Sequence, residues 1–183
     1  MSCLINVGLT RDCGFSFGGL SALYLLSKEE IASVAKGTDN TITGITFTTG
    51  ATEMIAFEFE PNTGQLLQEL QAGSASRFVN QTINGQFANL TQAKKEALED
   101  LANAYVVALV KDQSGKYWFA GESGRGLIAT ALSIDTGLAE ADAYVASITL
   151  VGGALGYANE VSSAAALAAI SGCNRLGSIN RLV

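Results

Sequence analysis

Histidine is absent from this chain of 183 residues, so neither a Ser-His-Asp triad nor a Cys-His pair can form, and the commonest metal ligand is missing. The cysteines Cys3, Cys13 and Cys173 are odd in number and lack CxxC spacing. This pattern favours reduced thiols over a disulfide framework or a zinc site. We therefore expect no metal, no cofactor and no enzymatic activity.

Charged side chains are also scarce, at 15% of the residues, whereas 48% are hydrophobic. The surface of a soluble monomer usually carries more charge, so we expect copies of this chain to cover one another in a homo-oligomer. The net charge is −6, and no run of five or six basic residues occurs. A surface that grips phosphates is therefore disfavoured, although an acidic protein can still lie beside nucleic acid without holding it.

Long apolar runs are missing as well. The first residues lack the charged segment and apolar run of a signal peptide, and nowhere do about 18 apolar residues follow one another. We expect no contact with a membrane.

What the chain does contain is a succession of strand-like segments. Alternation and β-branched residues predict strands at residues 20–26, 41–49 and 53–60, and the only proline, Pro61, follows the last of them. Strict alternation in the third segment predicts one apolar and one acidic face. We expect Ile55, Phe57 and Phe59 on the first face and Met54, Glu58 and Glu60 on the second.

A polar hairpin is predicted next. Residues 65–72 and 77–83 form the strand pair, and the small residues 73–76 form its tip. Asn84 and Gly85 predict a tight turn of type I′. Between residues 69 and 89 only Glu69 and Arg77 are charged, so we interpret this stretch as a long hairpin that meets other subunits.

The clearest signals follow. An amphipathic helix with Thr91 as its N-cap is predicted over residues 91–103, and a dense apolar strand over 104–110. A hairpin through 112–115 leads to a strand at 117–119. Two more strands, at 127–134 and 144–151, are joined across 135–137. This order predicts one helix packed on an antiparallel sheet.

Three further segments have weaker signals, and two of them allow alternatives. Residues 27–36 fit a short helix or a turn between strands, and the Ala-rich residues 161–170 predict a second short helix before Gly172. Phe15 and Phe17 lie in a Gly-rich lead-in that is either an arm docked on a neighbour or an ordinary N-terminal strand.

Two segments deserve a chemical test. The G-x-x-G-x-G run at 121–126 is followed by a strand, whereas a dinucleotide-binding loop leads into a helix, so we predict a wide hairpin loop. Asp135, Glu140 and Asp142 lack the ligand spacing of a calcium loop, so we interpret them as solvated charges.

Together these signals predict a mainly β (α+β) fold: an antiparallel β-sandwich or barrel with one flanking helix, a long hairpin and extended terminal arms. We assign residues 1–40 to an N-terminal arm and lead-in, 41–153 to the β-sandwich core with its helix at 91–103, and 154–183 to a C-terminal arm.

The order of elements over residues 41–153, with the segment Val-Lys-Asp-Gln-Ser-Gly-Lys-Tyr-Trp-Phe-Ala-Gly at 110–121 and Tyr-Val-Ala-Ser-Ile-Thr-Leu-Val-Gly-Gly at 144–153, resembles phage virion structural proteins. The layout is most similar to that of tail tube subunits. The resemblance implies stacked, usually hexameric, rings of identical subunits around a channel that passes DNA without specific binding. It also implies contact with other virion proteins and a place in the virion, assembled in the host cytoplasm.

An acidic channel wall repels phosphates, and the candidates for that wall are Glu53, Glu58 and Glu60. The candidates for contacts between subunits are Phe15, Phe17, Arg77, Phe78, Asn84, Gly85, Arg175 and Arg181. Two other readings stay open: a different virion part, such as a capsid decoration protein or a neck or tail-completion ring, and a soluble enzyme or ligand-binding sandwich.

Overall fold

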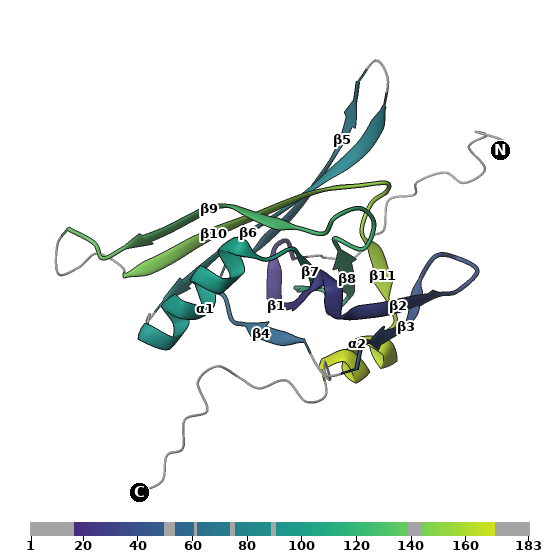
Figure 1. The fold of residues 1–183 in the computed structure, drawn as a ribbon, viewed down its shortest axis with the longest axis horizontal. Helices are drawn as coiled ribbons and strands as arrows, with labels where there is room; N and C mark the ends of the chain where they lie inside the picture. The colour runs from purple at the N-terminus through teal and green to yellow at the C-terminus, as the bar shows by residue number, and fades with distance from the viewer. Residues whose placement is uncertain are drawn as a thin grey trace, which may run out of the picture.

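Two β-sheets and two helices form the fold in a computed structural model that describes residues 17–49, 54–60, 62–73, 76–88, 91–138 and 144–170 (Figure 1). The predicted mainly β α+β class is confirmed. The larger sheet has seven strands, in the order β2-β3-β11-β8-β7-β1-β4. Its strands are β1 Leu20–Ser27, β2 Ile31–Lys36, β3 Ile42–Phe47, β4 Ile55–Phe57, β7 Val106–Asp112, β8 Tyr117–Ala120 and β11 Asn159–Val161.

The smaller sheet has four strands in the order β5-β6-β10-β9, all antiparallel. They are β5 Gln65–Ala72, β6 Arg77–Ala88, β9 Ile128–Asp135 and β10 Val145–Ala154. The hairpin β5–β6 and the pair β9–β10 are therefore confirmed. A β-bulge interrupts the pairing of β9 with β10, because Thr149 lies opposite Ala131 and Leu150 lies opposite Ala129. Thr130 is the extra residue.

The two sheets face each other across one hydrophobic core, and the larger sheet has a second core on its other face. Alternate residues of β7 explain this arrangement: Val106, Ala108 and Val110 join the core between the sheets, while Val107 and Leu109 join the core beneath α2 (Ser163–Ile170). Both faces of β7 are covered, which accounts for its unbroken apolar sequence.

Helix α1 (Gln92–Asn103) closes one end of the sandwich. The predicted N-cap is confirmed, because the hydroxyl of Thr91 accepts a hydrogen bond from the Lys94 backbone N–H at 3.4 Å. Leu98 and Leu101, from its predicted apolar stripe, are buried in the core between the sheets. Neither α1 nor α2, the helices that the described residues form, has the length and apolarity that crossing a membrane requires.

The helix considered for residues 27–36 is wrong. Only Lys28–Glu30 form a short 3-10 turn, and Ile31–Lys36 form β2, an edge strand paired with β3. Ile31 and Val34 fit a helical spacing, but as strand residues they pack against the second core. Pairing with β3 supplies the backbone partners, so tertiary contacts override the local pattern.

The tight turn predicted at Asn84-Gly85 is also wrong, because both residues lie inside β6 and pair with β10. A Cβ added at Gly85 would lie 2.0 Å from Cε1 of Phe59. Phe59 in turn stacks on Phe87, with 5.5 Å between the ring centroids. Glycine is needed here for a close approach rather than for a turn.

The strand predicted over residues 53–60 is shorter than expected, since β4 covers only Ile55–Phe57. Two residues differ from the predicted faces, because Met54 is buried in the second core and Ile55 is exposed. Phe57 and Phe59 lie on one side as predicted, packed against the core between the sheets. The chain leaves the sheet after Phe57, so the strand ends before Glu58.

The described parts of the two predicted arms contribute strands and a helix to the folded body. β1 lies between β4 and β7 and is the most buried part of residues 17–40. β11 pairs with β8 and β3, and α2 packs beneath the larger sheet. Residues 1–16 and 171–183 lie outside the described residues.

Candidate assembly surfaces

The predicted acidic wall divides between two places. Glu58 is exposed and lines a cleft of about 440 Å³ between β1 and β4, which Ile170 at the end of α2 also lines. Glu60 is half-buried, and its backbone N–H donates to the Gln86 carbonyl at 2.9 Å, so it lies beside β6. Glu53 lies outside the described residues. Both carboxylates lie in the segment between β4 and β5, with Glu58 on the cleft and the Glu60 backbone bonded to β6.

The predicted contact residues also divide. Phe17 is 78% exposed, and Arg77 and Phe78 lie at the tip of the hairpin β5–β6, which projects beyond the body (Figure 1). Asn84 and the buried Gly85 lie in the middle of the sheet. Phe15, Arg175 and Arg181 lie outside the described residues, as do Glu140 and Asp142.

The face of the four-stranded sheet that points away from the core is open. Along β6 the odd-numbered residues from Val79 to Phe87 are buried, and the even-numbered residues are not. No described helix or strand covers this face in Figure 1. The residues that alternation places on it are Gln65, Leu67, Glu69, Gln71, Phe78, Asn80, Thr82, Asn84, Gln86, Ala88, Val145, Ser147, Thr149, Val151, Gly153, Ile128, Ala131, Ser133 and Asp135.

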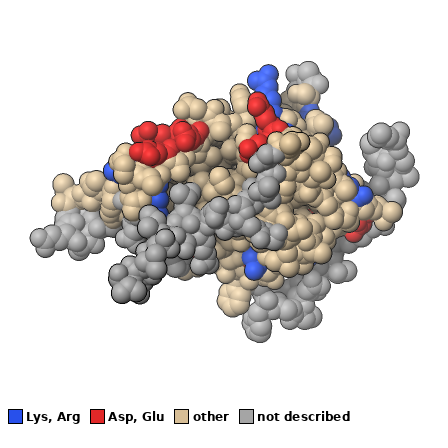
Figure 2. Space-filling model, turned by 60° about the horizontal axis from the view of Figure 1, so that its bottom comes forward, with Lys and Arg blue, Asp and Glu red and all other residues tan. Residues whose placement is uncertain are grey.

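The chemistry of this open face is polar but almost uncharged. It carries two carboxylates, Glu69 and Asp135, and within the described residues it carries no Lys or Arg. Asn84 links its strands, because the Thr149 hydroxyl lies 3.0 Å from the Asn84 Oδ1 atom. Figure 2 shows that charge is sparse over much of another face of the molecule too. Such a surface offers phosphates few attachment points.

Both outer edges of the same sheet end without a further strand among the described residues. β5 and β9 are each eight residues long, and each carries one charged residue and neither Lys nor Pro. Edge strands of monomeric proteins usually carry features that block pairing with another chain. Apart from the bulge in β9, these two edge strands lack the commonest of these blocking features.

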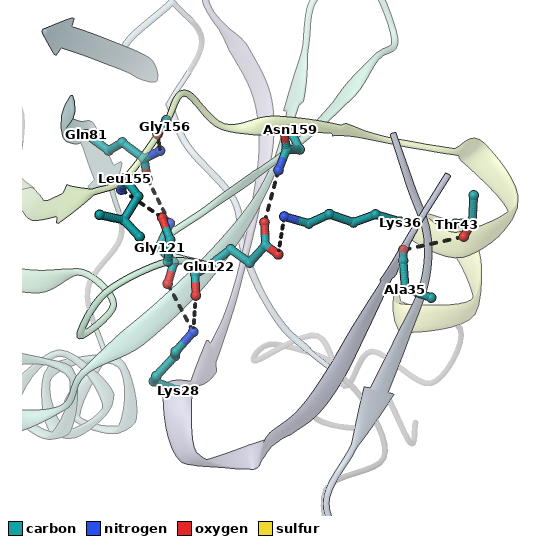
Figure 3. A network of polar contacts seen from close by, with 11 residues as sticks. Lys28, Ala35, Lys36, Thr43, Gln81, Gly121, Glu122, Leu155, Gly156 and Asn159 are labelled. Atoms are coloured by element: carbon teal, nitrogen blue, oxygen red, sulfur yellow. Dashed lines mark hydrogen bonds and ion pairs between the residues drawn. The ribbon is translucent and has the colours of Figure 1, made fainter. Parts of the chain in front are cut away.

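A polar network joins the two sheets, and the sequence reading missed it (Figure 3). Gln81 of β6 is only 2% exposed; its Oε1 atom accepts the Gly121 backbone N–H at 2.8 Å, and its Nε2 atom donates to the Gly156 carbonyl at 3.1 Å. Gly121 opens the loop 121–126 between β8 and β9. The loop is confirmed, but the predicted hairpin is wrong, because β8 pairs with β7 and β11 in the larger sheet whereas β9 pairs with β10 in the smaller one. Gln81 fastens this loop to the smaller sheet. The only sequence signal was a glutamine at an inward position of a strand.

Lys28 and Glu122 complete this network. The Lys28 ammonium donates to the carbonyls of Gly121 and Glu122. Burial lowers the pKa of Lys28 from its usual value, and the Glu122 carboxylate opposes that shift. Glu122 itself pairs with Lys36 at 2.7 Å and accepts a hydrogen bond from Asn159 at 3.0 Å. Polar groups from β2, β11 and the loop are thus satisfied together.

These groups do not form a metal site, since no cluster of three Cys, Asp or Glu side chains suited to an ion exists among the described residues. No known protein family matches the sequence, and no curated protein does.

Proposed function

We propose that this chain is a structural subunit of a phage tail tube, which assembles with copies of itself into stacked rings around a channel for DNA. The observation that carries the proposal is the four-stranded sheet, which among the described residues has an open, nearly uncharged face and two unpaired edge strands of equal length. The features of the sequence that resemble tail tube subunits support the same function.

Strand direction makes the two edges complementary. The four strands alternate in direction, so β5 and β9 run antiparallel to each other. When β9 of one copy lies beside β5 of the next, the pair continues the antiparallel pattern. Such a head-to-tail contact repeats from copy to copy and closes into a ring when the rotation allows it.

The stagger of the sheet also suits a closed ring. β5 pairs with residues 77–84 of β6. β9 pairs with β10, and this pairing places β9 level with residues 82–88 of β6. Counted along β6, the span level with β9 therefore begins five residues later than the span opposite β5 and ends four residues later. If β9 pairs with all of the next β5, a shift of this size over four strands, at about 3.4 Å per residue and about 4.8 Å between strands, tilts the strands by roughly 35–42°. Closed barrels typically have tilts of about 35–45°.

Two surfaces compete as the channel wall. One is the open face of the four-stranded sheet, which becomes continuous around such a ring. The other is the acidic group predicted from the sequence, of which Glu58 lies on the cleft between β1 and β4. Either surface would let a polyanion pass, because neither offers clustered Lys or Arg.

Electron microscopy of the purified protein tests the proposal directly. We expect tubes or stacked rings in negative stain, together with a large, concentration-dependent species in gel filtration. Single rings that do not stack favour a neck or tail-completion protein, and trimers favour a capsid decoration protein. A monomer at every concentration contradicts self-assembly and supports a soluble sandwich instead.

A further inference from the structure

One carboxylate holds both a lysine and an asparagine from different strands. The Oε1 atom of Glu122 lies 2.7 Å from Nζ of Lys36 on β2, and its Oε2 atom accepts a hydrogen bond from Nδ2 of Asn159 on β11 at 3.0 Å. Figure 3 shows the three side chains converging on one point from three elements. An ion pair needs only the Lys36 ammonium and the Glu122 carboxylate. The Asn159 side-chain amide on the second carboxylate oxygen is a further group with which Lys36 can react.

We propose that Lys36 and Asn159 are the site of an intramolecular amide bond, formed with Glu122 as the general base and then the general acid. The reaction needs no oxidant and no cofactor. It is independent of the proposed tail tube function, since it concerns one subunit alone.

The step balances within these three residues. The Glu122 carboxylate takes one proton from the Lys36 ammonium, and the neutral Nζ attacks the side-chain carbonyl carbon Cγ of Asn159. The tetrahedral intermediate then breaks its bond to Nδ2, which leaves as ammonia after receiving a proton from Glu122. The product is an amide between Nζ and Cγ, and the amine's remaining surplus proton leaves with the ammonia as ammonium. Escape of this product into water makes the bond permanent.

Contacts around Glu122 fix the position of the three groups. Lys28 donates to the backbone carbonyls of Gly121 and Glu122, and the next residue, Ser123, accepts the Leu155 backbone N–H through its hydroxyl at 3.0 Å. The Glu122 side chain is only 19% exposed, and that of Lys36 is 37% exposed. Holding reactants in place in this way can replace an intermolecular encounter by a fast internal step.

The bond would strengthen a weakly paired part of the sheet. β11 pairs with β8 over three residues and with β3 through one residue pair, Val161 with Ile42. On the other side of β3, Ile42 also lies opposite Lys36. A link from Lys36 to Asn159 would therefore tie the edge strand β2 to β11 across β3.

Intact-mass spectrometry of the purified full-length protein tests the proposal. We expect a mass lower than that of the sequence by one ammonia, and a tryptic species in which residues 29–77 are joined to residues 126–175. Lys36→Arg keeps the positive charge but removes the amine nucleophile, so it should restore the full mass. Glu122→Gln should do the same in protein that circular dichroism shows to be folded.

Lys116→Arg is the matched control, because Lys116 pairs with Glu160 at 3.4 Å and no asparagine amide among the described residues bonds to that carboxylate. This variant should keep the lower mass. A full mass in the unaltered protein overturns the proposal. Loss of ammonia that persists in Lys36→Arg overturns it too, because it would show cyclisation of an asparagine without the lysine. Persistence in Glu122→Gln would remove the assigned role of Glu122.

Discussion

Gly85 shows how one residue depends on a distant partner. The ring of Phe59 lies where a side chain at Gly85 would be, and the same ring stacks on Phe87 two residues further along β6. Asn-Gly is a strong turn signal in sequence. That signal is local, whereas the contact that selects glycine comes from a separate segment of the chain, so sequence reasoning could not find it.

Gly85→Ala should therefore destabilise the fold. Its Cβ would overlap the Phe59 ring, which must leave its stacked position, and overpacking of this kind costs about 1–3 kcal/mol. Urea unfolding of the unassembled protein measures the change. Gly156→Ala is the control, because nothing lies within 4 Å of a Cβ added there, and its effect should stay within about 0.5 kcal/mol. Equal stability of the two variants would contradict the proposed role of the ring.

Gln81 is the second residue whose role depends on its surroundings. Replacing it with leucine leaves the Gly121 N–H and the Gly156 carbonyl without their partner. Each such buried group costs about 1–3 kcal/mol. We expect Gln81→Leu to lower the free energy of unfolding by at least that amount in urea titrations. Gln86→Leu, at an exposed position of the same strand, should have little effect. A neutral Gln81→Leu would mean that water reaches both backbone groups.

At the scale of elements, the four-stranded sheet ends in β5 and β9, which no other described strand pairs with and which the proposed ring would join. Alternation and turn chemistry predicted β5, β9, β10 and the start of β6, because each is bounded by polar or glycine-rich residues. Helix α1 was equally clear from its cap and its stripe. The layering was harder to predict: β1, β11 and α2 join the core through pairings between segments far apart in sequence.

Ala131→Lys should block assembly. Ala131 is exposed on β9, and a lysine on an edge strand opposes pairing with another chain. We expect a folded monomer in gel filtration, with an unchanged circular dichroism spectrum. Ala32→Lys makes the same change at an exposed alanine of β2, an edge of the larger sheet, and should leave assembly intact. Loss of assembly in both variants, or in neither, would contradict a contact through the smaller sheet.

The candidate site was only partly visible in the sequence. Small residues flanked by strands revealed the hairpin tip with Arg77 and Phe78. The polar network was not visible, because Lys28, Gln81, Glu122 and Asn159 are scattered along the chain and carry no spacing motif. The fold alone brings them together.

For the whole molecule, the proposed tube has two candidate channel walls. Glu60 lies beside β6, next to the open face, while Glu58 lies on the cleft between β1 and β4. A lysine that faces the bore of an assembled tube would meet DNA from every subunit. A lysine elsewhere would not.

Gln86→Lys should make assembled particles retain DNA if the open face lines the channel, since Gln86 is exposed on that face. Each ring would gain a circle of positive charge, and retention should fall steeply as salt rises. Glu58→Lys is the comparison, and on this view it leaves retention near the level of the unaltered particles. Sedimentation of particles with labelled DNA over a salt series measures both variants. The reverse result would assign the wall to the acidic group instead.

The bulge at Thr130 affects the register in which a strand of a neighbouring copy would pair with β9. Apart from this one residue, β9 offers a neighbour a uniform ladder, on which a slip of two residues would keep every side chain on its proper face. The bulge marks a single position along β9. A neighbouring strand that paired out of register would therefore meet the bent backbone of the bulge where regular pairing needs a straight strand. One surplus threonine could thereby keep every ring in an assembly at the same pitch.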